Sequence, residues 1–146
     1  MFRRVLVGFD GSRGAEAALR AGLSLASASE GEVTVLVVAS ASQGETAEDR
    51  RAAFADEVGP LVGAAEQQVA GLGHERPRAA VHAVVGDRPA EALSSYLLEH
   101  GFDLLVVGRH GRDHAARGGL GRVAKELADK GRCPLLLVGD GEAAGD

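Results

Sequence analysis

Near its start the chain reads Val5-Leu6-Val7-Gly8-Phe9-Asp10-Gly11-Ser12, an apolar run that ends in a polar turn. The run is continuous rather than alternating, which indicates a strand covered on both faces, as in a parallel sheet. Small and apolar residues then recur at helical spacing from Ala15 to Ala26, which predicts an amphipathic helix directly after the turn. A buried strand followed by such a helix is the repeating unit of an α/β domain.

Four further apolar runs have the length of strands, and they cover residues 33–38, 79–85, 104–107 and 135–138. The run at 79–85 is the most mixed, because His82 interrupts it, and we expect this strand nearer an edge of the sheet. Helical segments separate the runs. Thr46 begins the second helix with a capping box, and Gly59-Pro60 should kink or break that helix.

A third helix begins at Pro89, where proline is tolerated in the first turn, and Leu120 to Ala128 define a fourth. The order β-α-β-α-β-α-β-α-β predicts one doubly wound α/β domain, with five parallel strands and helices on both faces. We assign residues 1–139 to this domain and 140–146 to an acidic, flexible tail.

Composition excludes several classes of protein. The 146 residues carry a net charge of −5, and aromatic residues make up 3%, which argues against a nucleic-acid partner. The apolar runs are too short to span a membrane, and we expect no signal peptide before the first strand. Cys133 is the single cysteine, which excludes an internal disulfide and predicts a buried structural thiol, with a redox sensor as the alternative. We therefore expect a cytoplasmic protein.

Ligands of open parallel sheets bind beyond the carboxyl ends of the strands, where the strand order reverses. The stretch from Gly108 to Arg122 follows such an end and contains five glycines. Residues 109–132 carry a net charge of +4, so the rest of the chain carries −9. A glycine-rich basic loop before a helix favours phosphate binding. A solvated connection whose arginines only aid solubility remains the alternative.

Other motifs point away from particular chemistries. The sequence contains no Gly-x4-Gly-Lys-[Ser/Thr] phosphate loop, no Gly-x-Gly-x-x-Gly after a strand and no Gly-x-Ser-x-Gly elbow. His110 and His114 have the spacing of a helical metal pair but lie in a glycine-rich loop, so we expect solvated histidines and no metal site. We expect Asp87 to be the N-cap of a helix, and a role in a binding site is the second possibility.

Four segments in this order resemble the universal stress protein family, from Arg4 to about Val138: residues 5–12, 86–93, 103–111 and 133–138. The resemblance implies a Rossmann-like, adenine nucleotide alpha hydrolase-like fold with sheet order 3-2-1-4-5. It further implies a homodimer formed through the last strand, and an adenine nucleotide held between the first and fourth strands.

Nucleotide-binding members of that family carry Gly-x2-Gly-x9-Gly followed by Ser or Thr. Gly108, Gly111 and Gly121 keep this spacing, but Arg122 replaces the hydroxyl residue. A lost hydrogen bond weakens affinity roughly tenfold to a hundredfold, although an arginine can instead contact a phosphate oxygen. The remaining nucleotide-binding residues that the resemblance implies are Asp10 for ribose or adenine, Val38 through its backbone, and Gly118 and Gly119 for phosphate.

Two function classes follow. The first is a stress-response protein that binds ATP, ADP or AMP as a regulatory ligand, with Mg²⁺ as an ion that can accompany the phosphates. The alternative is a dimeric interaction module of the same family in which Arg122 prevents nucleotide binding. Catalysis is at most slow ATP hydrolysis, for which Asp113 and His110 are the only candidate bases in the loop.

Overall fold

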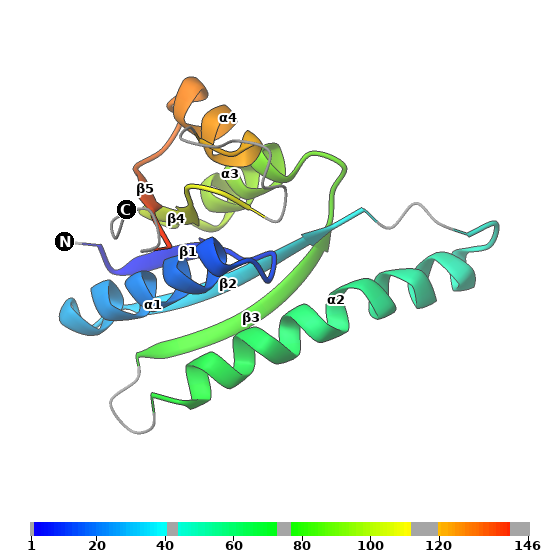
Figure 1. Cartoon of the computed structure of the whole chain (residues 1–146), viewed down its shortest axis with the longest axis horizontal. Coiled ribbons are helices and arrows are strands. Elements are labelled where there is room, and N and C mark those ends of the chain that lie inside the picture. Colours follow the sequence, from blue (N-terminus) through cyan, green and yellow to red (C-terminus); the bar gives the residue numbers. More distant parts are fainter. Residues whose placement is uncertain (1, 41–43, 73–76, 112–119, 141–146) are drawn as a thin grey trace.

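The structure is a computed structural model, and it describes residues 2–40, 44–72, 77–111 and 120–140 (Figure 1). Strands and helices alternate along the chain as predicted. The strands are β1 (Arg4–Gly8), β2 (Glu32–Ala39), β3 (Arg78–Val85), β4 (Leu104–Gly108) and β5 (Leu135–Val138). The helices are α1 (Arg13–Ala28), α2 (Ala47–Ala70), α3 (Pro89–His100) and α4 (Arg122–Lys130).

All five strands are parallel, and their order in the sheet is β3-β2-β1-β4-β5. The chain first moves outward from β1 to β3 and then returns to β4 on the other side of β1. The strand order therefore reverses between β1 and β4, where neighbouring strands send their connections to opposite sides. The predicted fold class and sheet order are confirmed.

Helices cover the two faces of the sheet, with α1 and α2 on one side and α3 and α4 on the other (Figure 1). Alternate residues of β1 feed the two cores: Val5 and Val7 pack with α1 and α2, whereas Leu6 packs with α3 and α4. These three side chains are fully buried. Burial of each contributes about 1.5–3 kcal/mol to folding, which explains the continuous apolar runs of the sequence.

The expectation for the His82 strand is confirmed, because β3 lies at one edge of the sheet. Exposed residues alternate with partly buried ones along β3, whereas Val5 to Val7 of β1 and Leu104 to Val107 of β4 are buried. An edge strand has a neighbour on one side only, so polar side chains are tolerated there.

Helix α2 continues through Gly59-Pro60, so of the predicted kink or break the break is wrong. Proline removes the amide that would bond to the carbonyl of Asp56. Both Pro60 and Asp56 are exposed, and water can therefore satisfy that carbonyl. The buried residues of α2, Val58, Ala65 and Val69, lie on both sides of the proline and hold the helix on the sheet.

The helix starts follow the sequence signals with one exception. Thr46 Oγ1 accepts the amide of Asp49 at 3.0 Å, and the reciprocal bond completes the predicted capping box. Pro89 is the first residue of α3, as predicted. The exception is Asp87, because the N-cap of α3 is Arg88 and Asp87 precedes it. The expected capping role of Asp87 is therefore wrong.

Helix α1 ends in a left-handed residue that is not glycine. Glu30 has φ +54°, and the next amide, that of Gly31, donates to the carbonyl of Ala26 at 2.7 Å. This is the pattern of a Schellman cap, whose left-handed position normally holds glycine. A residue other than glycine costs roughly 1–2 kcal/mol of folding free energy in that conformation. A glycine in place of Glu30 would remove this cost, but part of the gain would be lost because glycine has greater conformational freedom in the unfolded chain.

We therefore expect Glu30→Gly to raise the free energy of unfolding by about 0.5–1 kcal/mol. Urea denaturation followed by circular dichroism measures this change. Glu66→Gly is the matched control, because the exposed Glu66 lies inside α2 and the same substitution there should cost about 1 kcal/mol. A loss of stability in both variants would contradict the assignment of Glu30 to a strained cap.

Candidate functional site

A cavity of about 380 Å³ lies at the carboxyl ends of the strands, where the strand order reverses. Its wall combines apolar side chains with glycines and a small number of charged groups, the composition of a small-molecule site. The lining residues are Gly8, Phe9, Asp10, Ser12, Ala15, Leu36, Val38, Ser40, Glu57, Gly86, Asp87, Pro89, Leu93, Val107, Gly108, His110, Gly111, Arg122, Val123 and Ala124.

The turn between β1 and α1 holds the carboxylate of Asp10 in place. Asp10 Oδ1 accepts the amide of Ser12 at 3.0 Å. Gly11 between them has φ +83°, a conformation that favours glycine. Ser12 is the N-cap of α1, and its hydroxyl accepts the amide of Ala15 at 3.1 Å. Asp10 therefore supports the turn before the helix while it lines the cavity.

The loop after β4 passes directly against Asp10. A Cβ added at Gly111 would lie 2.7 Å from Asp10 Oδ2, so only a glycine allows this approach without displacement. Gly108 approaches α1 just as closely, because a Cβ there would lie 2.6 Å from the carbonyl carbon of Gly14. The structure thus brings together three predicted site residues, Asp10, Gly108 and Gly111.

Helix α4 begins at the wall of the cavity. Its N-cap is Gly121, which offers no side chain to the first amides of the helix. The amide of Gly121 donates to the carbonyl of Arg109 at 2.7 Å, which anchors the helix start to the loop after β4. Arg122, the first helical residue, is exposed and lines the cavity. Gly118 and Gly119 lie outside the described residues.

Val38 lies on β2 and lines the same cavity, beside the α3–α4 core. Five of the eight predicted site residues therefore line one cavity: Asp10, Val38, Gly108, Gly111 and Arg122. Gly121 adjoins it through the bond to Arg109. Contact of these residues with a ligand stays a prediction.

A model of the universal stress protein family matches residues 1–139. The chain belongs to the universal stress protein family. The resemblance carried by the four sequence segments is thereby confirmed.

Solved structures of the family share this fold. The universal stress protein UspA from Lactobacillus plantarum is 21% identical, with a TM-score of 0.80 over 94% of this chain and 97% of that one. A universal stress protein in complex with cAMP is 24% identical, with a TM-score of 0.72 over 94% of this chain and 97% of that one. A third, from Archaeoglobus fulgidus in complex with dAMP, is 20% identical, with a TM-score of 0.68 and coverage of 94% and 98%. At these identities the likeness establishes the fold.

Several titratable residues of the cavity wall were not among the predicted nucleotide-binding residues, although Asp87 was named as a second-choice site residue and His110 as a candidate base. Glu57 reaches it from α2, whose residue Leu61 packs over the turn at Gly11. Asp87 lines it from the β3–α3 turn, and His110 lines it from the loop after β4. For Asp87 and His110, position after a strand end was an available signal. For Glu57 there was none, because only the packing of α2 brings it to the site.

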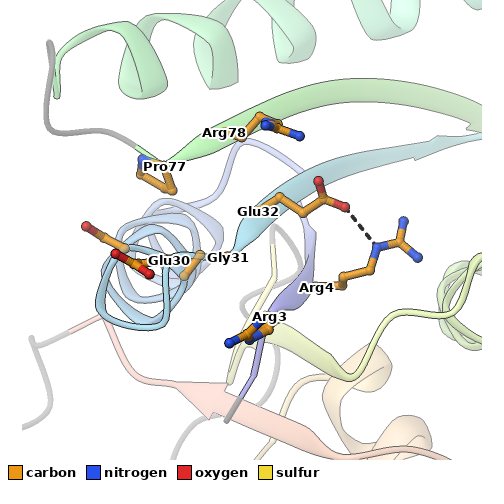
Figure 2. Close-up of a pocket in the computed structure, with 9 residues that line it drawn as sticks. Arg3, Arg4, Glu30, Gly31, Glu32, Pro77 and Arg78 are labelled. Atoms are coloured by element: carbon orange, nitrogen blue, oxygen red, sulfur yellow. Dashed lines mark hydrogen bonds and ion pairs between the residues drawn. The ribbon is translucent and has the colours of Figure 1, made fainter.

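A larger cavity, of about 550 Å³, opens at the opposite end of the sheet. Figure 2 shows Arg78, Glu32 and Arg4 there, on the neighbouring strands β3, β2 and β1. Arg4 Nε donates to Glu32 Oε1 at 2.8 Å, and the guanidinium lies 4.5 Å from the Phe102 ring centroid. The same guanidinium donates to the carbonyl at the end of α3, His100. Arg4 thus ties the amino ends of the strands together, and we assign this end to stability rather than to ligand binding.

Among the remaining candidates, Cys133 is the one that the structure describes away from the cavity wall. Cys133 is partly buried against the α3–α4 core, and this burial raises the pKa of its thiol. A raised pKa keeps the thiol protonated and less nucleophilic at neutral pH, which favours the structural role. His114 and Asp113 lie outside the described residues.

Among the helices in the described part of the chain, none has the length and apolar character needed to cross a membrane.

Proposed function

We propose that this chain binds an adenine nucleotide, ATP, ADP or AMP, as a regulatory ligand in a cytoplasmic stress response. The observation that carries the proposal is the 380 Å³ cavity at the reversal of strand order, with Asp10 on one side and the start of α4 on the other. Cavities of this size accommodate small ligands. Structural relatives that hold cAMP and dAMP support a purine nucleotide as the ligand class.

The proposed orientation follows from charge. The first amides of a helix have no partner within the helix and favour anions, so the phosphates lie against the start of α4, with Gly118 and Gly119, which precede it in the sequence, as further predicted phosphate-binding residues. The Arg122 guanidinium neutralises them, and Mg²⁺ can accompany them. Asp10 accepts hydrogen bonds from ribose hydroxyls, and the backbone of Val38 meets the adenine edge.

Binding without rapid turnover fits this arrangement. Hydrolysis needs a base beside the terminal phosphate. In the described part of the chain, His110 is the only candidate that the sequence analysis offered. We propose at most slow ATP hydrolysis, and steady phosphate release above background that is lost in His110→Ala would identify such an activity.

A homodimer through β5 is part of the proposal. Strand β5 has four residues, lies at the sheet edge opposite β3 and leaves Leu136 36% exposed. An apolar edge strand is a template for pairing with a second chain. Sedimentation of the purified protein distinguishes a dimer from a monomer.

Equilibrium titration of the purified chain with AMP, ADP and ATP tests the proposed ligand. We expect saturable binding in the micromolar range. The second candidate, a dimeric interaction module without a ligand, is favoured by one observation, the arginine where nucleotide-binding relatives carry Ser or Thr. Absence of binding at millimolar nucleotide would overturn the first proposal in favour of the second.

We expect Arg122→Ala to weaken AMP binding about tenfold, because a hydrogen bond to a charged group contributes about 1.5–3 kcal/mol. Isothermal titration calorimetry measures the change. Arg20→Ala is the control, since Arg20 is exposed on α1 and does not line the cavity. Tighter binding by Arg122→Ala would instead show that this arginine obstructs the site.

A further inference from the structure

Strand β3 forms an open edge of the sheet (Figure 1). It pairs with β2 along its eight residues in one continuous register, and no other described strand pairs with its outer side. Edge strands of natural proteins are protected by charged side chains, prolines, bulges or short length. Residues 79–85 contain no proline and no Asp, Glu, Lys or Arg. The outer edge of β3 therefore lacks the usual protection against pairing with another chain.

The backbone groups that face outward from β3 follow from one hydrogen bond. The amide of Gly86 donates to the carbonyl of Ala39 on β2 at 2.9 Å, so the amide at position 86 points toward β2. Backbone groups of successive residues point to opposite sides of a strand. The outward amides and carbonyls therefore belong to the residues at odd positions, namely Ala79, Val81, Ala83 and Val85. These residues are arranged symmetrically about His82.

Because of this symmetry, an antiparallel copy of β3 matches the edge. A two-fold axis normal to the sheet at His82 places this residue opposite the partner's His82. Ala79 then lies opposite the partner's Val85. Val81 lies opposite the partner's Ala83. All outward groups of both strands are used in this register, whereas a shift along the strand leaves some of them without a partner.

The charges at the two ends of β3 complement each other in the same arrangement. Arg78 is the first residue of the strand, and Asp87 follows its last residue by two positions. Within the described chain, neither side chain forms a hydrogen bond or an ion pair. Antiparallel pairing places Arg78 opposite the partner's Gly86 and so beside the partner's Asp87. This pairing of opposite charges occurs at both ends of the interface, which favours a second copy as the occupant.

The edge is accessible from both faces of the sheet. Arg78, Ala80 and His82 are exposed on the face that α3 and α4 cover elsewhere. On the opposite face, α2 packs against β2 as well as β3, so it lies over the sheet. Val85, at the end of the strand, is 62% exposed. Pairing would therefore cover apolar surface that the single chain leaves in water.

We propose that β3 pairs in antiparallel orientation with β3 of a second copy of this chain, with His82 at the two-fold axis. This interface is separate from the one proposed through β5, because the two strands lie at opposite edges of the sheet. Chains that pair through both edges form assemblies larger than a dimer.

Single cysteines on β3 test the register, in a Cys133→Ala background that removes the natural thiol. His82→Cys places two thiols at a non-hydrogen-bonded pair, whose Cα atoms lie about 4.5 Å apart, within the range of a disulfide. Oxidised glutathione should therefore give a covalent dimer on a non-reducing gel. Ala80→Cys is the matched control, because Ala80 is exposed on the same face of the same strand. The two copies of residue 80 lie about 14 Å apart, too far for a disulfide.

Absence of the disulfide in His82→Cys, or equal crosslinking of Ala80→Cys, would overturn the proposal. A crosslink to a different protein in place of the second copy, when oxidation is carried out in cell lysate, would also overturn it. Absence of the β5 dimer would leave the crosslink at residue 82 unaffected, so the two interfaces are tested separately.

A charge at the axis tests the same interface without a covalent bond. His82→Glu places two carboxylates opposite each other, which should weaken association about fivefold. His82→Gln is the uncharged control and should associate like the natural chain. Sedimentation equilibrium measures both variants, and His82 is exposed, so neither change disturbs the core. Equal association of His82→Glu and His82→Gln would contradict the placement of His82 at the axis.

Discussion

Gly108→Ala is expected to lower the free energy of unfolding by about 1–3 kcal/mol, with the upper part of that range expected. The added Cβ would lie 2.6 Å from the carbonyl carbon of Gly14 and 2.8 Å from its Cα and oxygen. These are backbone atoms at the first turn of α1, so no side-chain rotation relieves the overlap. The helix must move away from β4, which also separates two walls of the cavity.

Chemical denaturation of the natural chain and of Gly108→Ala measures this loss of unfolding free energy. Gly63→Ala provides the control, because a Cβ at Gly63 meets nothing within 4 Å. Gly63 lies inside α2, where alanine is favoured over glycine by up to about 1 kcal/mol, so this variant should gain stability. If Gly108→Ala were as stable as the natural chain, the close packing of α1 on β4 would not be a requirement of the fold.

Gly121→Val is expected to weaken adenine nucleotide binding at least about a hundredfold. A Cβ at Gly121 would lie 3.2 Å from the carbonyl oxygen of Arg109 and the Cα of His110, and 3.3 Å from the amide nitrogen of Gly111. The branched side chain of valine enlarges this overlap and displaces the start of α4 from the loop. Two lost hydrogen bonds to a charged phosphate, at about 1.5–3 kcal/mol each, account for the factor of a hundred.

Titration with AMP measures the effect, and thermal unfolding of the same samples separates lost binding from lost folding. Ala128→Val is the control, because Ala128 is exposed on the same helix and the change adds two methyl groups to Cβ, whereas Gly121→Val adds the Cβ as well. It should bind like the natural chain. Unchanged affinity in a folded Gly121→Val would place the phosphates elsewhere than at the start of α4.

Most of the fold could be predicted from the sequence because its signals are local. The continuous apolar run around Leu6 and the stripe of small residues on α1 each indicate burial directly. Thr46 marks the start of α2 because it forms the hydrogen bonds of a helix cap with a residue three positions away. The break predicted at Pro60 was wrong because the effect of this proline is not decided by its neighbours in the sequence. Its effect depends on whether water reaches the carbonyl of Asp56, which the position of α2 on the surface decides.

Some residues of the candidate site could likewise be predicted from the sequence, and others could not. Asp10 and Gly111 could be placed together in advance, since parallel strands that neighbour each other end at the same edge of the sheet. The role of Asp87 was misjudged because the helix begins one residue later than a cap at that position requires. Glu57 could not be found at all, because its neighbours in the sequence give no sign that α2 passes over the cavity.

The order of residues by itself determined which segments are buried and therefore which elements form, because side-chain hydrophobicity and helix-end chemistry act over a few residues. It also determined that glycines occur where strand ends meet loops. Only the tertiary structure decided which charges share the cavity, that Arg122 is among them, and that Glu57 reaches it from α2. Those relations depend on how helices pack on the sheet, and close packing sums contacts between residues far apart in the chain.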